Sequence, residues 1–160
     1  MPRYRCTLAS IATLASFVGG SLVAQSPDLA PYLILDRAAE VTLARSSAPK
    51  NVSDSATVLV LTRTGYVEAA HGTNGFTCLV MRSFLGGLED PAYWSPKVRA
   101  PACFNPPASR TVLVETLKRA EWVMAGVTQS EIATRTERAF ASREFPLPTA
   151  GAMMLGTWIS

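Results

Sequence analysis

The sequence predicts an α+β fold: a small antiparallel β-meander packed on one face by two or three helices, with a long disulfide-stapled loop. Three observations predict it. Short segments rich in β-branched residues lie between residues 57 and 82. Apolar residues recur with helical spacing after residue 110. A pair of cysteines, Cys78 and Cys103, brackets most of the irregular stretch between these two regions.

The first 24 residues have the layout of a secretory signal peptide. Arg3 and Arg5 precede an apolar run over residues 8–23, and Ala24 is the small residue after which cleavage is expected. A single small domain then covers residues 25–160. The alternative is an uncleaved leader that anchors the protein in the cell envelope. No second apolar segment of that length follows, so we expect no membrane span in the mature chain.

The net charge of the mature chain is close to neutral. The formal charge of +3 falls to +1 when Arg3 and Arg5 leave with the leader, since thirteen basic and twelve acidic side chains remain. Binding to nucleic acid needs clustered Lys and Arg. A nucleic-acid partner is therefore not expected.

The first helix of the domain is expected over residues 36–45. Asp36 can cap it, and Pro49 follows its end. Helical spacing places three apolar residues on the expected buried face: Leu35, Ala39 and Leu43.

Three strands are expected next. Residues 57–62 are apolar and β-branched at alternate positions, and residues 66–71 and 76–82 continue an extended pattern. Residues 72–75, Gly-Thr-Asn-Gly, contain the Asn-Gly pair typical of a tight turn. These segments predict an antiparallel meander.

Residues 83–110 are expected to form a proline-rich loop, because five prolines interrupt any regular element. The loop carries enough apolar side chains to pack against the domain. Its aromatic residues Tyr93, Trp94 and Phe104 are candidates for a ligand-contact surface, although rings of this kind more often pack in a core.

Two helices follow the loop. Leu113, Leu117, Ala120 and Met124 define an apolar stripe that ends near Gly126, and Thr128 with Glu131 forms a capping box for the second helix. That helix also carries Glu131 and Arg135 as an i,i+4 pair. The apolar tail from residue 150 predicts a final strand or the beginning of a segment that the chain lacks.

Cys78 and Cys103 are the only cysteines left after the leader, so an exported protein is expected to join them in a disulfide. Closing this loop stabilises the fold by about 3.5 kcal/mol. A competing interpretation makes Cys78 a catalytic thiol activated by His71, which a two-residue hairpin loop would place opposite it. With a single His in the chain, no metal site is expected, and no cofactor is indicated.

Residues 72–80 (Gly-Thr-Asn-Gly-Phe-Thr-Cys-Leu-Val), residues 94–97 and residues 103–106 resemble a group of uncharacterised exported bacterial proteins. The resemblance covers most of the mature chain and implies a bacterial source and export, to the periplasm or outside the cell, but no activity. Relatives of that kind continue into a His-containing region, so this chain is expected to be truncated or divergent at its end.

These observations predict an exported, non-enzymatic binding or structural module of the cell envelope whose ligand is unknown. The alternatives are a secreted hydrolase or thiol enzyme using Cys78 and His71, and an envelope protein held by an uncleaved leader.

Overall fold

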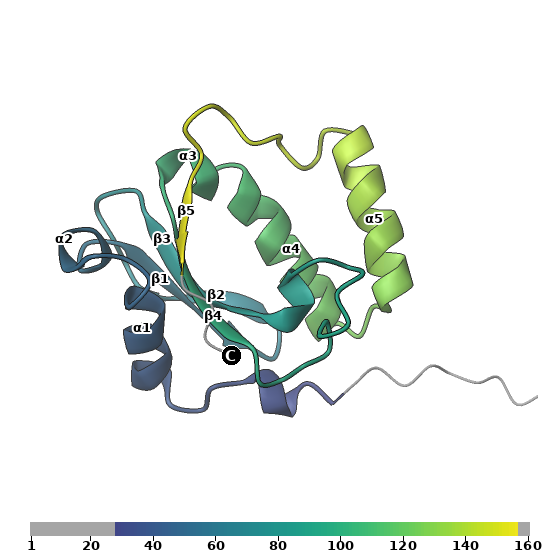
Figure 1. The fold of residues 1–160 in the computed structure, drawn as a ribbon, viewed down its shortest axis with the longest axis horizontal. Coiled ribbons are helices and arrows are strands. Elements are labelled where there is room, and N and C mark those ends of the chain that lie inside the picture. Colours follow the sequence, from purple (N-terminus) through teal and green to yellow (C-terminus); the bar gives the residue numbers. More distant parts are fainter. Residues whose placement is uncertain (1–27, 157–160) are drawn as a thin grey trace, which may run out of the picture.

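The computed structural model describes residues 28–156 and confirms the α+β class (Figure 1). The expected leader, residues 1–24, lies outside the described residues. Two short 3₁₀ turns, η1 and η2, accompany the helices and strands. In chain order the elements are η1 (Ala30–Tyr32), α1 (Arg37–Arg45), α2 (Lys50–Ser53), β1 (Thr57–Thr62), β2 (Gly65–Ala70), β3 (Thr77–Arg82), η2 (Ser83–Leu85), β4 (Arg99–Phe104), α3 (Pro106–Ser109), α4 (Val112–Met124), α5 (Gln129–Ala141) and β5 (Met154–Gly156).

The strands form one sheet in the order β2-β1-β3-β4-β5. Neighbouring strands are antiparallel except β1 and β3, which run parallel and pair only at Thr57 with Thr77 and at Val58 with Cys78. The three strands expected between residues 57 and 82 are all present. Their order differs from a meander, because β3 lies beside β1 and not beside β2.

The connection between β2 and β3 explains this order, because it crosses the start of β1. The Ser55 carbonyl accepts two backbone N–H groups of the connection, at 2.8 and 3.3 Å. Thr57 Oγ1 accepts the N–H of Gly72 at 3.1 Å. A Cβ on Gly72 would lie 2.1 Å from the Thr57 nitrogen and 2.3 Å from the Ala56 carbonyl carbon, so only glycine allows this close approach. The Gly-Thr-Asn-Gly segment is therefore a crossover and not a hairpin turn.

Helices cover both faces of the sheet, although the sequence led us to expect them on one. Helix α1 packs on β1, β3 and β4, whereas α4 packs on the opposite face and α5 packs on α4 (Figure 1). Ala44 joins Val58 and Val80 in the core beneath α1, and Leu113 joins Leu79 and Phe104 beneath α4. Strands covered on both faces have continuous apolar sequences, which is why the strand segments show little polar alternation.

The disulfide between Cys78 and Cys103 is present, as expected. The two residues are paired directly across β3 and β4, with Cα atoms 4.0 Å apart, and both are fully buried. Ser47 Oγ, which follows α1, lies 3.0 Å from the Cys103 sulfur. The disulfide therefore joins two neighbouring strands beneath α1.

Most of the expected helix signals are confirmed. Asp36 caps α1 by accepting the N–H groups of Ala38 and Ala39. Helix α4 ends before Gly126, which has φ +79°. Thr128 caps α5. The expected stripe of α4 faces inward: Leu113 and Ala120 are buried, and Leu117 and Met124 are partly buried.

The expected buried face of α1 is wrong at two of its three residues, and only Leu43 packs, partly buried, against the core beneath the helix. Leu35 is 93% exposed and Ala39 is exposed, whereas Glu40 and Ala44 are buried. The reason is an ion pair between Glu40 and Arg82, which lies far away in the sequence. Helical spacing of apolar residues cannot reveal a buried carboxylate whose partner is on another element.

The proline-rich stretch contains a strand that the sequence did not predict. Residues 86–98 form the loop, but β4 and α3 lie within the expected loop boundaries. Cys78 and Cys103 form a non-hydrogen-bonded pair of β3 and β4, because their Cα atoms approach closely. Pairing types alternate along an antiparallel ladder, so Pro101, two residues from Cys103, is also at a non-hydrogen-bonded position. Its backbone nitrogen therefore points away from β3. On that side β5 pairs only from Ala102 onward. Pro101 therefore interrupts no backbone pairing. β5 itself confirms the final-strand interpretation of the tail.

Candidate functional site

The structure does not bring His71 and Cys78 together in the way that the thiol interpretation needs. Cys78 is bonded to Cys103 and has no exposed surface. His71 follows β2, with its side chain 79% exposed and its Nδ1 3.2 Å from a Glu68 carboxylate oxygen. Strand β1 lies between β2 and β3, so the cross-strand apposition expected from a hairpin does not form.

Two of the three aromatic residues expected at a contact surface belong to the core. Tyr93 and Phe104 are almost completely buried, in the clusters beneath α4. Trp94 is partly exposed and packs edge-on against Tyr93, with ring centroids 4.8 Å apart. The rings of this region stabilise the loop against the sheet.

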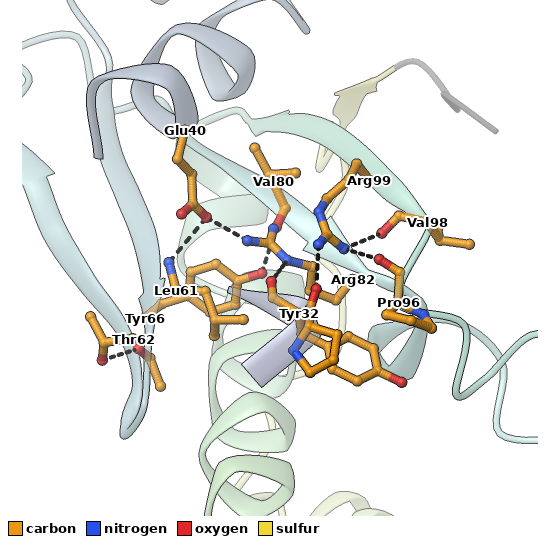
Figure 2. Close-up of polar contacts among 12 residues, drawn as sticks. Tyr32, Glu40, Leu61, Thr62, Tyr66, Val80, Arg82, Pro96, Val98 and Arg99 are labelled. Carbon is orange, nitrogen blue, oxygen red and sulfur yellow. Dashed lines mark hydrogen bonds and ion pairs between the residues drawn. The ribbon is translucent and has the colours of Figure 1, made fainter. Parts of the chain in front are cut away.

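A buried ion pair fills the gap where β1 and β3 separate (Figure 2). Glu40 from α1 lies 2.8 Å from Arg82 Nη2, and each residue is 1% exposed. The same carboxylate oxygen accepts the backbone N–H of Leu61 at 3.1 Å. Since β1 no longer pairs with β3 at this point, Glu40 supplies the acceptor that a neighbouring strand would otherwise provide.

The Val80 carbonyl on the opposite side of the gap also has side-chain partners. Tyr66, from β2, donates its hydroxyl to this oxygen at 2.6 Å, and Arg82 donates Nη1 to it. Burial raises the pKa of Tyr66 well above its ordinary value, because the phenolate would be poorly solvated there. The neutral hydroxyl thus remains a donor throughout the physiological pH range.

Two arginines at the other end of this cluster hold the segment before α1. Arg82 donates Nε to the Tyr32 carbonyl at 2.7 Å, and Arg99 donates Nη2 to the Pro31 carbonyl at 2.8 Å (Figure 2). Arg99 also donates to the carbonyls of Pro96 and Val98. Burial and, secondarily, the nearby Arg82 lower the pKa of Arg99.

This buried cluster is structural. Each of the three guanidinium nitrogens of Arg82 donates to a carbonyl or to the Glu40 carboxylate, and Arg82 and Glu40 are enclosed. Arg119 acts in the same manner on α4, where it donates to the carbonyls of Phe84, Leu85 and Gly86. The buried cations therefore connect irregular segments to the sheet and helices instead of facing a substrate.

A surface groove is formed by residues of α1, of α2 and of the segment that joins them. It has a volume of about 300 Å³. Its lining combines apolar, hydroxyl and charged side chains: Val41, Thr42, Arg45, Ser46, Ala48, Lys50, Ser53 and Asp54. Val41 and Ala48 pack against the core beneath α1 and give the groove an apolar floor.

Arg45 is the most informative residue of this groove. Its Nε atom is buried without a hydrogen-bond partner, as is that of Arg119, but unlike Arg119 it also forms no hydrogen bond to the described residues through its terminal nitrogens. A buried donor without an acceptor is unfavourable by about 1–3 kcal/mol, so such groups call for an explanation. Arg45, Lys50 and Asp54 line the same groove, which leaves the lining with one net positive charge.

The sequence did not predict this groove. Its residues come from the last turns of α1, the next few residues and α2, and they form no recognisable motif. The signal that could have drawn notice is the pair of cations, Arg45 and Lys50, on either side of Pro49. A second hollow, between the loop and α5, is lined by Leu88 and Gln129, but there Gln129 already donates to the Leu88 carbonyl.

These features define a small disulfide-stabilised α+β domain with an amphipathic groove between α1 and α2. Within residues 28–156, no helix has both the length and the apolar character needed to cross a membrane. The same residues contain no cluster of three or more His, Cys, Asp or Glu side chains suited to a metal ion. Comparisons with protein-family models, with curated proteins and with solved structures found no match to this chain.

Proposed function

We propose that the chain is an exported bacterial protein of the cell envelope, periplasmic or secreted, that binds a ligand without transforming it. The α1–α2 groove is its binding surface. The observation that carries this proposal is the Arg45 guanidinium, which lines a groove with an apolar floor and forms no hydrogen bond to the described residues. Clefts of this size with a few polar groups are the usual form of small-molecule sites.

Four further features support export and a non-catalytic role. The leader-like residues 1–24 and the resemblance to exported bacterial proteins favour secretion. A disulfide is typical of oxidising compartments. The same disulfide occupies the sulfur on which the thiol-enzyme alternative depends, and the buried charges serve the fold.

The first test is the intact mass of the protein recovered from its host, with thiol labelling before and after reduction. We expect a chain that begins near Gln25 and takes two labels only after reduction. Labelling of Cys78 without reduction would contradict the disulfide-bonded module and would support the thiol-enzyme alternative. His71→Ala would then be the next variant to test for lost thiol reactivity. Recovery of the full-length chain in the membrane fraction would support the anchored alternative.

A further inference from the structure

We propose that the α1–α2 groove binds a small organic monoanion: a carboxylate attached to a short aliphatic chain. This inference rests on the proposed binding function and names the ligand class for the same groove. The contacts of Arg45, the charges of the lining and the apolar floor each contribute one part of the argument.

The carboxylate follows from Arg45. A cation in the last turn of α1 is favourable because it lies near the negative end of the helix dipole, and this accounts for the presence of an Arg there. It does not account for terminal nitrogens that form no hydrogen bond to the described residues and are not enclosed as Nε is. A guanidinium presents its terminal N–H groups as a planar fork that matches a carboxylate, and an incoming carboxylate would supply the acceptor that these groups lack.

The single negative charge follows from the balance of the lining. Arg45 and Lys50 contribute two positive charges and Asp54 contributes one negative charge. Since these side chains lie at the same groove, one additional anion brings it to neutrality. An ammonium group on the ligand would restore the imbalance, so we expect an acid without an amine.

The aliphatic chain of the proposed ligand follows from the apolar floor of the groove. Val41 and Ala48 are partly buried in the cluster beneath α1 and expose apolar surface to the groove. Covering this surface favours binding in proportion to the apolar area removed from water. The groove is open and about 300 Å³ in volume, which suits a short chain better than a long acyl chain.

Three matched probes test these steps on the oxidised, disulfide-intact protein. Hexanoate has the proposed features, hexanamide lacks the charge, and L-norleucine adds an α-ammonium group to the same chain. We expect hexanoate to shift the backbone amide resonances of residues 41–54 in an NMR titration, with a dissociation constant on the order of millimolar for so small a ligand. We expect hexanamide and norleucine to bind about tenfold more weakly.

Variants assign the effect to the groove. Arg45→Met removes the guanidinium while it keeps a long side chain, and it should weaken hexanoate binding about tenfold or more. The control is Arg138→Met on α5, an exposed cation outside the groove, which should leave the affinity unchanged. Asp54→Asn should strengthen hexanoate binding several-fold, because it removes the one negative charge of the lining.

The outcomes separate the ligand class from the binding function. Hexanamide that binds as tightly as hexanoate, or hexanoate binding unchanged in Arg45→Met, overturns the anion site. Norleucine that binds more tightly than hexanoate also overturns it and leaves the groove as a site for a zwitterion, so the binding function stands. Absence of shifts at residues 41–54 with all three probes overturns both the anion site and the groove as the binding surface.

Discussion

At the scale of single residues, Glu40 connects three elements that the backbone alone leaves apart. Its carboxylate oxygen accepts the N–H of Leu61 on β1 and pairs with Arg82 on β3, while its own backbone lies in α1. The desolvation of two buried charges offsets much of their attraction, so the pair adds little net stability. Removing one partner is different, because the other charge remains buried and uncompensated.

We therefore predict that Glu40→Gln lowers the free energy of unfolding by about 3–5 kcal/mol. The amide oxygen of Gln can still accept from Leu61, so the loss reports the charge of the carboxylate. Adding Arg82→Met to Glu40→Gln should cost less than the sum of the single changes, because the two residues are directly coupled. Urea unfolding of the three variants measures this coupling.

The matched control is the exposed ion pair on α5. Glu131 and Arg135 form an i,i+4 pair at the surface, and Glu131→Gln should change stability by only about 0.5 kcal/mol. Equal losses for Glu40→Gln and Glu131→Gln would show that Glu40 is not the buried partner of Arg82 that the structure describes.

Residue-level signals predicted some of these positions and not others. The disulfide follows from counting the two cysteines that remain after the expected leader, and the caps at Asp36 and Thr128 follow from local hydrogen-bonding chemistry. Glu40 and Arg45 carry no such local signal. Their importance depends on what lies opposite them in space, which one sequence does not show.

At the scale of elements, the crossover between β2 and β3 determines which strands become neighbours. Gly72 lies against the backbone of Ala56 and Thr57, and Ser55 accepts two N–H groups from the residues that follow Gly72. The sequence indicated a turn here, because Asn-Gly is also the signature of a hairpin. Here the same residues form a crossover, because Gly72 has no side chain and its backbone can lie close to the backbone of β1.

We predict that Gly72→Ala lowers the free energy of unfolding by about 3 kcal/mol or more, because its Cβ would lie 2.1 Å from the Thr57 nitrogen and the backbone must move. Gly87→Ala is the control. A Cβ there meets nothing within 4 Å, and the change should stay within about 0.5 kcal/mol. Thermal and urea unfolding compare the two. Equal stability of both variants would mean that the connection does not pass against β1.

At the scale of the whole molecule, local patterns predicted the fold class but not the arrangement of layers. Helices and strands with clear periodicity appear where the sequence indicates them, within a few residues. Helices on both faces and a sheet with β1 at the second position depend on contacts between distant residues. β4 was not predicted, because its proline and its continuous burial remove both the propensity and the alternation that identify a strand.

The three tyrosines within residues 28–156 connect this architecture to the effect of pH on stability. Tyr32 donates its hydroxyl to the Trp94 carbonyl at 2.6 Å, Tyr66 donates to Val80, and the Tyr93 hydroxyl is buried. Burial raises the pKa of all three above the ordinary value of 10.0. Tyr32 lies in η1, the Tyr66 hydroxyl reaches the gap between β1 and β3, and Tyr93 lies in the loop. Loss of their protons therefore destabilises three separate parts of the domain.

Because each folded-state pKa is raised, the unfolded chain loses tyrosine protons at a lower pH than the folded protein. Their contribution to stability is complete below about pH 10 and is lost as the pH rises through the folded-state values. We predict a free energy of unfolding that declines above about pH 10, by up to about 1.4 kcal/mol per pH unit for each tyrosine that remains protonated. Urea unfolding at a series of alkaline pH values measures the slope, and Tyr66→Phe should make it shallower. A wild-type slope that equals that of Tyr66→Phe, together with tyrosinate absorbance that appears near pH 10 in the folded protein, would contradict the burial of Tyr66 between β1 and β3.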